Sequence, residues 1–159
     1  MARLRCRFQR QYPELISSRL YNEQTFYRTF AYDMAYCKQE IVIESPFLTT
    51  RRINLLLPKM RRAIECGVRV IVNTRHPQEH EDYMRNEAVI GIARLQDIGV
   101  KVLLTGGHHR KLAIIDRTIL YEGSLNILSQ SDSCEIMRRI ESEQLAQQML
   151  RFTGIEKFL

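Results

Sequence analysis

Four side chains that could act together on a phosphate ester lie within a short stretch of the sequence. His109 and Lys111 stand two residues apart, immediately before the apolar run at residues 112–115. Side chains alternate along a strand, so residues two apart share one face. After a predicted return strand, Ser124 and Asn126 add a hydroxyl and a carboxamide. The set provides a nucleophile or base, a fixed cation and two neutral hydrogen-bonding groups, which suit phosphate-ester chemistry.

The spacing of these residues is more specific than their types. The pattern is H-x-K-x4-D at residues 109–116, and a G-S-x-N segment follows at residues 123–126. It resembles the HKD motif of the phospholipase D superfamily, and in particular the single-HKD domains carried by bacterial helicase- and restriction-type proteins. The resemblance spans about residues 22–152 and is strongest over residues 105–141. The matched polar positions are His109, Lys111, Asp116, Gly123, Ser124, Asn126 and Glu135.

The resemblance implies a metal-independent mechanism with a covalent intermediate. His109 would attack phosphorus and form a phosphohistidine, so that one displacement becomes two. A second histidine would protonate the leaving oxygen and later activate water. Lys111 and Asn126 would hold the non-bridging oxygens, where negative charge develops in the transition state. This chemistry calls for no metal and no cofactor.

The other matched residues are given supporting roles. Ser124 would hydrogen-bond within the phosphate-binding network, and Glu135 would orient an imidazole through its Nδ1 proton. Asp116 is interpreted as structural, fixing the turn or pairing with a basic group. Gly123 interrupts the strand and so delivers the hydroxyl that follows it.

The chain carries one HKD motif, whereas the family reaction uses two histidines. His108 does not supply the second one, because its side chain on an extended strand points away from that of His109. It also lacks a lysine two residues further on. We therefore expect a homodimer with two-fold symmetry, which brings two copies of His109 into one cleft.

Four further residues are candidates for lining the cleft or contacting substrate. Ser45 follows an apolar strand at a position where the resembling domains have a loop facing the cleft, although a simple strand-end turn explains it equally well. Arg75 and His76 precede a helical stretch near the cleft mouth of the family, and Arg110 lies within the motif. His76 and His80 also invite a zinc interpretation, but their order is not H-E-x-x-H and a proline marks a helix start, which favours a solvated helix.

Alternating helical and extended patterns predict the elements that position these residues. Helices are predicted over residues 22–37, 49–67 and 76–99, and Pro58 predicts a kink or a late start in the second. Strands are predicted over residues 40–44, 68–73, 100–104, 112–115, 118–121 and 135–141, and Ser142 caps a last helix. The order predicts an α/β fold: a phospholipase D-like sandwich with a mixed, mostly parallel sheet flanked by helices.

Length and composition are those of one globular domain with a basic surface. The 159 residues have a formal net charge of +6, and arginine outnumbers lysine among the 24 cations, which suits a polyanionic partner. Residues 1–21 are interpreted as a basic arm or linker remnant, and residues 22–159 as the catalytic domain. Four scattered cysteines without a C-x2-C pair disfavour a zinc ribbon or a disulfide framework. The sequence has no long apolar run and no secretory signal, so we expect no stable membrane insertion and a cytoplasmic location.

The motif does not choose among phosphodiesters, so three functions stay open. Size, arginine content and the lack of a membrane segment favour a nuclease, most simply an endonuclease acting on DNA rather than RNA. The second is a nucleic-acid-binding and dimerisation module of a larger helicase or restriction protein, with little turnover. The third is a phospholipid phosphodiesterase, for which the sequence offers no amphipathic membrane helix.

Overall fold

A seven-stranded sheet with the order β1-β7-β6-β5-β2-β3-β4 forms the centre of the molecule. The computed structural model describes residues 17–129 and 134–159, so most of the predicted basic arm lies outside the described residues. The strands are β1 (Ser18–Asn22), β2 (Glu40–Glu44), β3 (Arg69–Thr74), β4 (Lys101–Leu104), β5 (Leu112–Ile115), β6 (Ile119–Gly123) and β7 (Ile136–Glu141).

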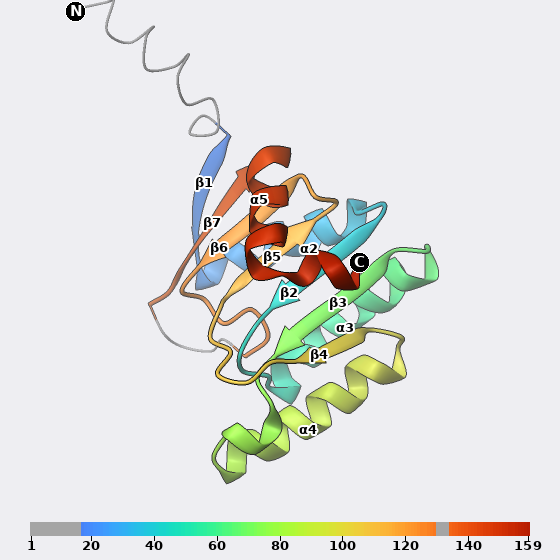
Figure 1. The fold of residues 1–159 in the computed structure, drawn as a ribbon, viewed down its shortest axis with the longest axis vertical. Helices are drawn as coiled ribbons and strands as arrows, with labels where there is room; N and C mark the ends of the chain where they lie inside the picture. The colour runs from blue at the N-terminus through green and yellow to red at the C-terminus, as the bar shows by residue number, and fades with distance from the viewer. Residues whose placement is uncertain (1–16, 130–133) are drawn as a thin grey trace, which may run out of the picture.

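Helices cover both faces of this sheet and make three layers (Figure 1). The far layer in that view contains α2 (Glu23–Tyr36) and α3 (Thr50–Glu65), with α4 (Asp82–Asp97) beside α3. The near layer contains α5 (Glu143–Thr153) and the 3-10 turn η3 (Ile155–Phe158). A second 3-10 turn, η2 (Pro77–Glu79), precedes α4. None of the helices in the described part of the chain has the length and apolar character needed to cross a bilayer.

Each face of the sheet contributes alternate side chains to its own core. Ile41 and Ile43 of β2 face the larger cluster, which includes Phe26 and Phe30 of α2. Val42, between them, faces the smaller cluster formed with α5. This alternation follows from the pleat of a strand covered on both sides, which explains why β2 and β5 read as continuous apolar runs in the sequence.

The cap predicted at Ser142 is confirmed, and side chains cap the starts of α2 and α3 as well. Asn22 caps α2, with its side chain accepting hydrogen bonds from the N–H groups of residues 24 and 25. Thr49 and Ser142 cap α3 and α5 in the same manner. The late start considered for α3 is wrong, because the helix begins at Thr50 and continues past Pro58.

The α/β class and the mixed sheet are confirmed, but the prediction that the sheet is mostly parallel is wrong. Only β2, β3 and β4 run parallel, because helical crossovers connect them. The pairs β2–β5, β5–β6, β6–β7 and β1–β7 are antiparallel. Residues 116–118 alone join β5 to β6, and a connection that short permits only a hairpin.

The first strand corrects the expected boundary of the basic arm. Residues 18–21 were assigned to the arm, yet they belong to β1, whose register places Ser18 opposite Ile140 and Asn22 opposite Ile136 on β7. As an edge strand, β1 has a polar, alternating sequence that carries no strong apolar signal. The sheet therefore begins before residue 22.

Asp116 holds the β5–β6 turn to the loop that precedes β2. Its carboxylate accepts hydrogen bonds from the N–H groups of Lys38, Gln39 and Glu40, at 2.9, 2.7 and 3.1 Å, and from the Cys37 thiol at 3.0 Å. Burial opposes ionisation of Asp116, but these donors outweigh it, so the pKa of the carboxyl lies below its ordinary value. Asp116 is thus placed for a structural role, away from the other motif residues.

Candidate active site

The loop before β5 places the side chains of His109 and Lys111 together. The Lys111 ammonium donates a hydrogen bond to the His109 carbonyl oxygen at 2.8 Å, and its Nζ lies 3.1 Å from His109 Nδ1. His109 is exposed, whereas the preceding His108 is buried, with 3% of its surface accessible. The alternation expected from the sequence therefore separates the two histidines, and only His109 presents its ring to solvent.

Antiparallel pairing of β5, β6 and β7 brings the remaining motif residues to the same edge of the sheet. The start of β5, the end of β6 and the start of β7 are neighbours in the register. A cavity of about 600 Å³ at this edge is lined by His109, Lys111, Ser124 and Glu135, among other residues. The four residues lie between positions 109 and 135 of the sequence, and the pairing of the strands brings them to one cavity.

Gly123 permits the close approach of β6 and β7 beside this cavity. A Cβ atom at position 123 would lie 2.2 Å from the carbonyl oxygen of Ile136, so no other residue fits without a backbone shift. The next residue completes the contact: the Ser124 N–H donates to Ile136 O at 3.0 Å, and the Ser124 hydroxyl accepts from Ile136 N–H at 3.2 Å. Ser124 therefore also fixes the start of β7, one residue after Glu135.

Positive charge around His109 favours its neutral form. The Lys111 ammonium, followed by partial burial and the Arg75 guanidinium, lowers the pKa of His109 below its ordinary value of 6.5. Burial also lowers the pKa of Lys111, although the nearby Glu135 carboxylate acts in the opposite direction. The site thus holds a neutral imidazole against a cation, as a nucleophile for an anionic ester requires.

This arrangement predicts how the rate of any reaction that uses His109 as nucleophile depends on pH on the acidic side of the profile. Protonation removes the attacking lone pair, so activity is lost as the pH falls through the pKa of His109. Because that pKa is depressed, we expect the midpoint of this loss below pH 6.5. Lys111→Met removes the largest cause and should move the NMR titration midpoint of the His109 ring upward. A wild-type midpoint at or above 6.5 would contradict the assignment of Lys111 as the neighbouring charge.

A buried ion pair fixes the loop that carries the motif. The Glu44 carboxylate is fully buried on β2 and accepts hydrogen bonds from the Arg110 guanidinium, including Nη2 at 2.9 Å. It also accepts from Asn73 Nδ2 at 2.9 Å, and Asn73 in turn accepts from the Thr105 hydroxyl at 2.9 Å. Arg110, a candidate substrate contact from the sequence, is therefore already committed to anchoring the loop.

Phe47 lies beside the motif on the loop after β2. Its ring meets the His109 ring edge-on, with centroids 6.1 Å apart, and also packs 5.3 Å from the His80 ring. The Arg75 guanidinium lies 5.8 Å from the Phe47 centroid. Arg75 thereby reaches the surroundings of His109, whereas His76 accepts a hydrogen bond from the Gln78 N–H and begins η2.

Unsatisfied polar atoms concentrate around these residues. Among the described residues, the buried side-chain nitrogen and oxygen atoms without a hydrogen-bond partner belong to Arg75, His80, His108 and Asn126. Two of these side chains pack against Phe47, and Asn126 shares a cavity with it. Buried polar groups without partners are costly, and in native proteins they cluster where ligands bind. The motif and its surroundings therefore form the candidate site.

A family model described as "Cardiolipin synthase, PLD-like domain" matches residues 32–153, most of the chain. The chain belongs to this phospholipase D-like family. The matched range includes every residue proposed for the site from the sequence, from Ser45 to Glu135. A search of curated proteins gave no match.

Solved structures show the same phospholipase D-like fold at low sequence identity. Nuc from Salmonella typhimurium, described as a phospholipase D family member, is 14% identical with a TM-score of 0.70, over 86% of this chain and 90% of its own. NucT from Helicobacter pylori is 18% identical with a TM-score of 0.64, and the match covers 85% of this chain and 91% of NucT. TrmBL2, described as an archaeal chromatin protein with a novel mode of DNA binding, is 10% identical with a TM-score of 0.61. The match covers 99% of this chain and 60% of TrmBL2.

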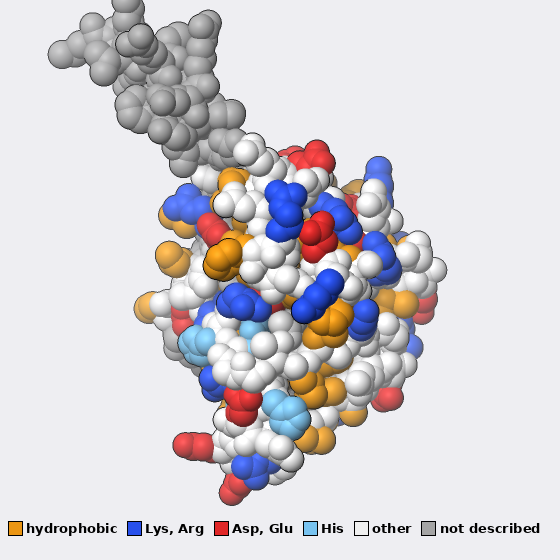
Figure 2. All heavy atoms as spheres, viewed as in Figure 1, with side chains coloured by type: hydrophobic (Ala, Val, Ile, Leu, Met, Phe, Trp, Pro, Cys, Tyr) orange, Lys and Arg blue, Asp and Glu red, His pale blue; other side chains and the backbone are white. Residues whose placement is uncertain are grey.

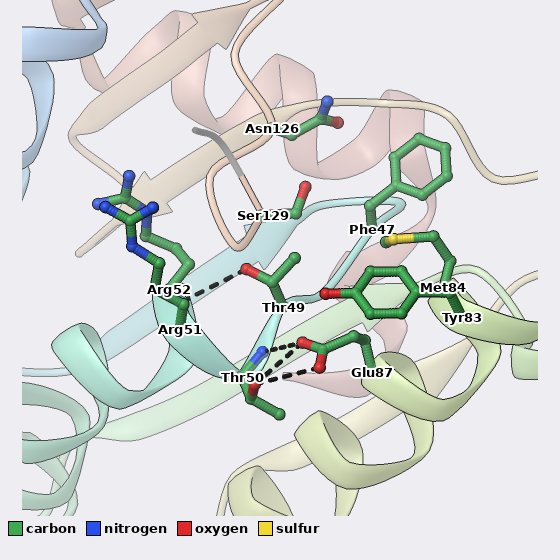
Figure 3. A pocket seen from close by; sticks show the side chains of 10 residues that line it. All are labelled: Phe47, Thr49, Thr50, Arg51, Arg52, Tyr83, Met84, Glu87, Asn126 and Ser129. Carbon is green, nitrogen blue, oxygen red and sulfur yellow. Dashed lines mark hydrogen bonds between the residues drawn. The ribbon is translucent and has the colours of Figure 1, made fainter. Parts of the chain in front are cut away.

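Two residues expected in this phospholipase D-like site are not among those that line the cavity at His109. Asn126 lines a neighbouring cavity of about 520 Å³, which borders Phe47 and is shown in Figure 3. Ser45 is fully buried, where its hydroxyl donates to Phe47 O at 3.1 Å and accepts from Leu128 N–H at 3.1 Å. Ser45 shapes the loop that presents Phe47 and has no exposed surface with which to contact a substrate.

The sequence interpretation missed Phe47 and Glu44 as parts of the phospholipase D-like site. Phe47 follows a proline after an apolar strand, a position with no pattern that separates it from core residues. Glu44 occupies the last position of a buried strand, and its pairing with Arg110 joins segments 66 residues apart. The sequence did contain one indication of this pair: Glu44 is a charged residue at the end of an apolar run, and a buried charge needs a partner.

Proposed function

We propose that this phospholipase D-like chain is a metal-independent phosphodiesterase that cleaves nucleic acid, most simply a DNA endonuclease. Membership of the family supports phosphodiester chemistry in general. The observation that carries it is the convergence of His109, Lys111, Ser124 and Glu135 on one open cavity. These residue types supply a nucleophile, a cation, a hydrogen-bonding hydroxyl and an acidic partner for an imidazole.

The proposed reaction has two displacements. The neutral His109 imidazole attacks phosphorus, a nitrogen–phosphorus bond forms, and the bond from phosphorus to the leaving oxygen breaks. A second imidazole, protonated at the start, gives a proton to that oxygen and becomes neutral. It then takes a proton from water as the water attacks phosphorus and releases His109. Lys111 offsets the charge that builds on the non-bridging oxygens during both steps.

The second imidazole is proposed to be His109 of the partner subunit in a homodimer. The described structure supports this with an apolar rim beside the cavity, where Phe152 of α5 is 83% exposed and Met149 lines the same wall. An exposed aromatic residue at the edge of a polar site is suited to being covered by a second copy. Two-fold symmetry would then place the two copies of the motif face to face.

Charge supports a nucleic acid over a lipid as substrate. The chain has a net charge of +6, and Figure 2 shows Lys and Arg side chains distributed over the face that carries α5. A basic surface binds the phosphates of a nucleic acid by releasing condensed counterions, with no dependence on sequence. DNA is favoured over RNA because the fold neighbours include a protein described by its DNA binding.

The proposed function predicts cleavage of DNA by the purified chain in excess EDTA. Single-stranded DNA, duplex DNA, single-stranded RNA and vesicles of phosphatidylglycerol should be compared under identical conditions. We expect hydrolysis of DNA with or without EDTA, and release of no headgroup from the vesicles. Hydrolysis of lipid alone would replace the nuclease proposal with a phospholipid phosphodiesterase. DNA binding without turnover would favour the alternative of a binding and dimerisation module in a larger protein.

A further inference from the structure

A second cavity, shown in Figure 3, is bordered by Phe47, the residue whose ring contacts that of His109. It has a volume of about 520 Å³ and is formed by the loop after β2, the start of α3 and the start of α4. Phe47 borders this cavity and contacts the His109 ring edge-on. Any group bound there would therefore be the immediate neighbour of a group held at His109.

The walls of this cavity differ in chemistry from side to side. Arg51 and Arg52 extend from α3 on one side, and Tyr83 and Phe47 present rings on the other (Figure 3). The Arg52 guanidinium is held over the Tyr27 ring, 3.7 Å from its centroid. Cations facing aromatic rings across a cavity provide complementary contacts for the phosphate and the base of one nucleotide.

Tyr83 is the aromatic residue with the greatest freedom to receive a ligand. Its side chain is 73% exposed in the first turn of α4, so it contributes little to the core. Arg51 is exposed as well, and within residues 17–129 and 134–159 no ion pair engages it. An exposed ring and an exposed guanidinium at one cavity are available for stacking and for a phosphate oxygen.

Asn126 lines the same cavity, but its side-chain oxygen is closed off from solvent. Its Oδ1 atom is buried and has no hydrogen-bond partner among the described residues. Figure 3 shows the carboxamide at the side of the cavity next to the Phe47 ring. A group bound in the cavity would reach that oxygen only after the carboxamide turned, so Asn126 is not counted among the ligand contacts.

The start of α3 is not the phosphate site of this cavity. Glu87 already occupies it, accepting from the Thr50 N–H at 2.6 Å and from the Thr50 hydroxyl at 3.0 Å. A second anion at that position would meet the Glu87 carboxylate and be repelled. The negative charge therefore restricts a phosphate to the Arg51 side and leaves the Tyr83 side to an uncharged base.

We propose that this cavity binds the nucleotide next to the scissile phosphate, in single-stranded nucleic acid. The base stacks on Tyr83, and the flanking phosphate contacts Arg51. The inference rests on the proposed nuclease function and adds a preference for single strands. In a duplex each base is stacked and paired inside the helix, so its face cannot reach Tyr83.

The test compares cavity variants with matched controls elsewhere on the surface. Tyr83→Ala and Arg51→Gln alter the cavity at exposed positions. Tyr36→Ala removes another exposed tyrosine at the opposite end of β2, and Arg61→Gln removes an exposed arginine about 15 Å along α3 from Arg51. Each variant is made in a His109→Asn background, which keeps the oligonucleotide intact, and the His109→Asn chain alone serves as the wild-type reference for binding. Each chain is titrated by fluorescence anisotropy with a labelled single-stranded oligonucleotide and with its duplex.

We expect Tyr83→Ala to weaken binding of the single strand about ten-fold, because it removes one stacked base. Arg51→Gln should weaken it about three-fold and lower the salt dependence by about one ion. Duplex binding should change less than about two-fold in Tyr83→Ala, and both controls should match the wild type. Equal binding of the single strand by Tyr83→Ala and wild type would overturn the proposal, as would equal losses for single strand and duplex.

A small diester separates failure of this inference from failure of the proposed function. Bis(4-nitrophenyl) phosphate has no flanking nucleotide, so its hydrolysis should have the same kcat/KM in wild type and in Tyr83→Ala. Loss of its hydrolysis in Tyr83→Ala would overturn the inference, because the cavity would then serve the reacting phosphate itself. If the wild type hydrolyses neither substrate, the nuclease proposal fails, and the anisotropy titrations still decide whether the cavity binds a nucleotide.

Discussion

Replacing His109 with asparagine is expected to lower kcat on a phosphodiester by about 10⁴-fold, as loss of a catalytic nucleophile does. The carboxamide occupies a similar volume but cannot form the nitrogen–phosphorus bond. His109 is exposed and its ring makes no core contact, so folding should be unaffected. The measurement is steady-state cleavage of DNA in excess EDTA, with far-UV circular dichroism and DNA affinity as checks on the fold and on binding.

Retained cleavage by His109→Asn would refute the proposed nucleophile and with it the two-displacement mechanism. Loss of cleavage together with loss of DNA affinity would instead assign His109 to substrate binding. The two results are separable because the phosphate contacts that dominate affinity come from arginine and lysine, and the variant leaves these residues in place.

The same variant tests whether two subunits share one site. When wild type and His109→Asn are unfolded together and refolded at equal amounts, random pairing makes about a quarter of the dimers wholly wild type. If the reaction needs His109 from both subunits, specific activity falls to about that quarter. If each subunit acts alone, half of the activity remains, and the homodimeric site is then excluded. Sedimentation of the mixture confirms that dimers are present.

Local patterns in the sequence were sufficient to predict the elements and the motif geometry. The caps at Asn22, Thr49 and Ser142 are short-range interactions, so a few neighbouring residues determine them. The pairing of His109 with Lys111 follows in the same way from alternation along an extended segment. The phospholipase D-like family was identified from these spacings because the motif is compact in sequence.

Features that depend on distant pairing could not be predicted in this manner. Whether two strands pair in a parallel or an antiparallel manner depends on which strands become neighbours in the sheet. The alternation of side chains along a single strand is the same in both cases, so it cannot predict the antiparallel half of this sheet. Asn126 follows Ser124 by two residues, yet it lines the neighbouring cavity while Ser124 lines the cavity at His109. The partnership of Glu44 with Arg110 likewise exists only in the folded chain.

A second long-range ion pair connects α2 to the sheet and provides the largest expected effect on stability. Asp33 of α2 is 7% exposed and accepts hydrogen bonds from Arg139 Nε of β7, at 2.7 Å, and from the Tyr121 hydroxyl of β6. Burial and the Asp33 carboxylate raise the pKa of Tyr121, which keeps its proton available for this bond. The carboxylate is thus the one acceptor that both donors share in the described structure.

Asp33→Ala is expected to lower the free energy of unfolding by about 3–5 kcal/mol, the range for breaking a buried ion pair by removing one partner. The loss exceeds that of a surface ion pair because the Arg139 guanidinium stays largely buried, with 15% of its side chain exposed. It keeps only its longer ion pair, at 3.3 Å, with the exposed Glu141 among the described residues. The Tyr121 hydroxyl also loses its acceptor in a fully buried position. Urea unfolding monitored by circular dichroism measures the difference, with the slope m checked for two-state behaviour.

Two controls identify the cause of this destabilisation. Asp82→Ala breaks an ion pair with Arg85 in which the aspartate side chain is 95% exposed, and its unfolding midpoint should match that of the wild type. The double variant Asp33→Leu with Arg139→Met replaces both charges by apolar groups, and it should regain most of the stability lost in Asp33→Ala. If the double variant is as unstable as the single one, the contribution of Asp33 lies in the Tyr121 hydrogen bond and not in an uncompensated guanidinium charge. The ion pair would then serve to fix α2 over β6 and β7, with little net stabilisation of its own.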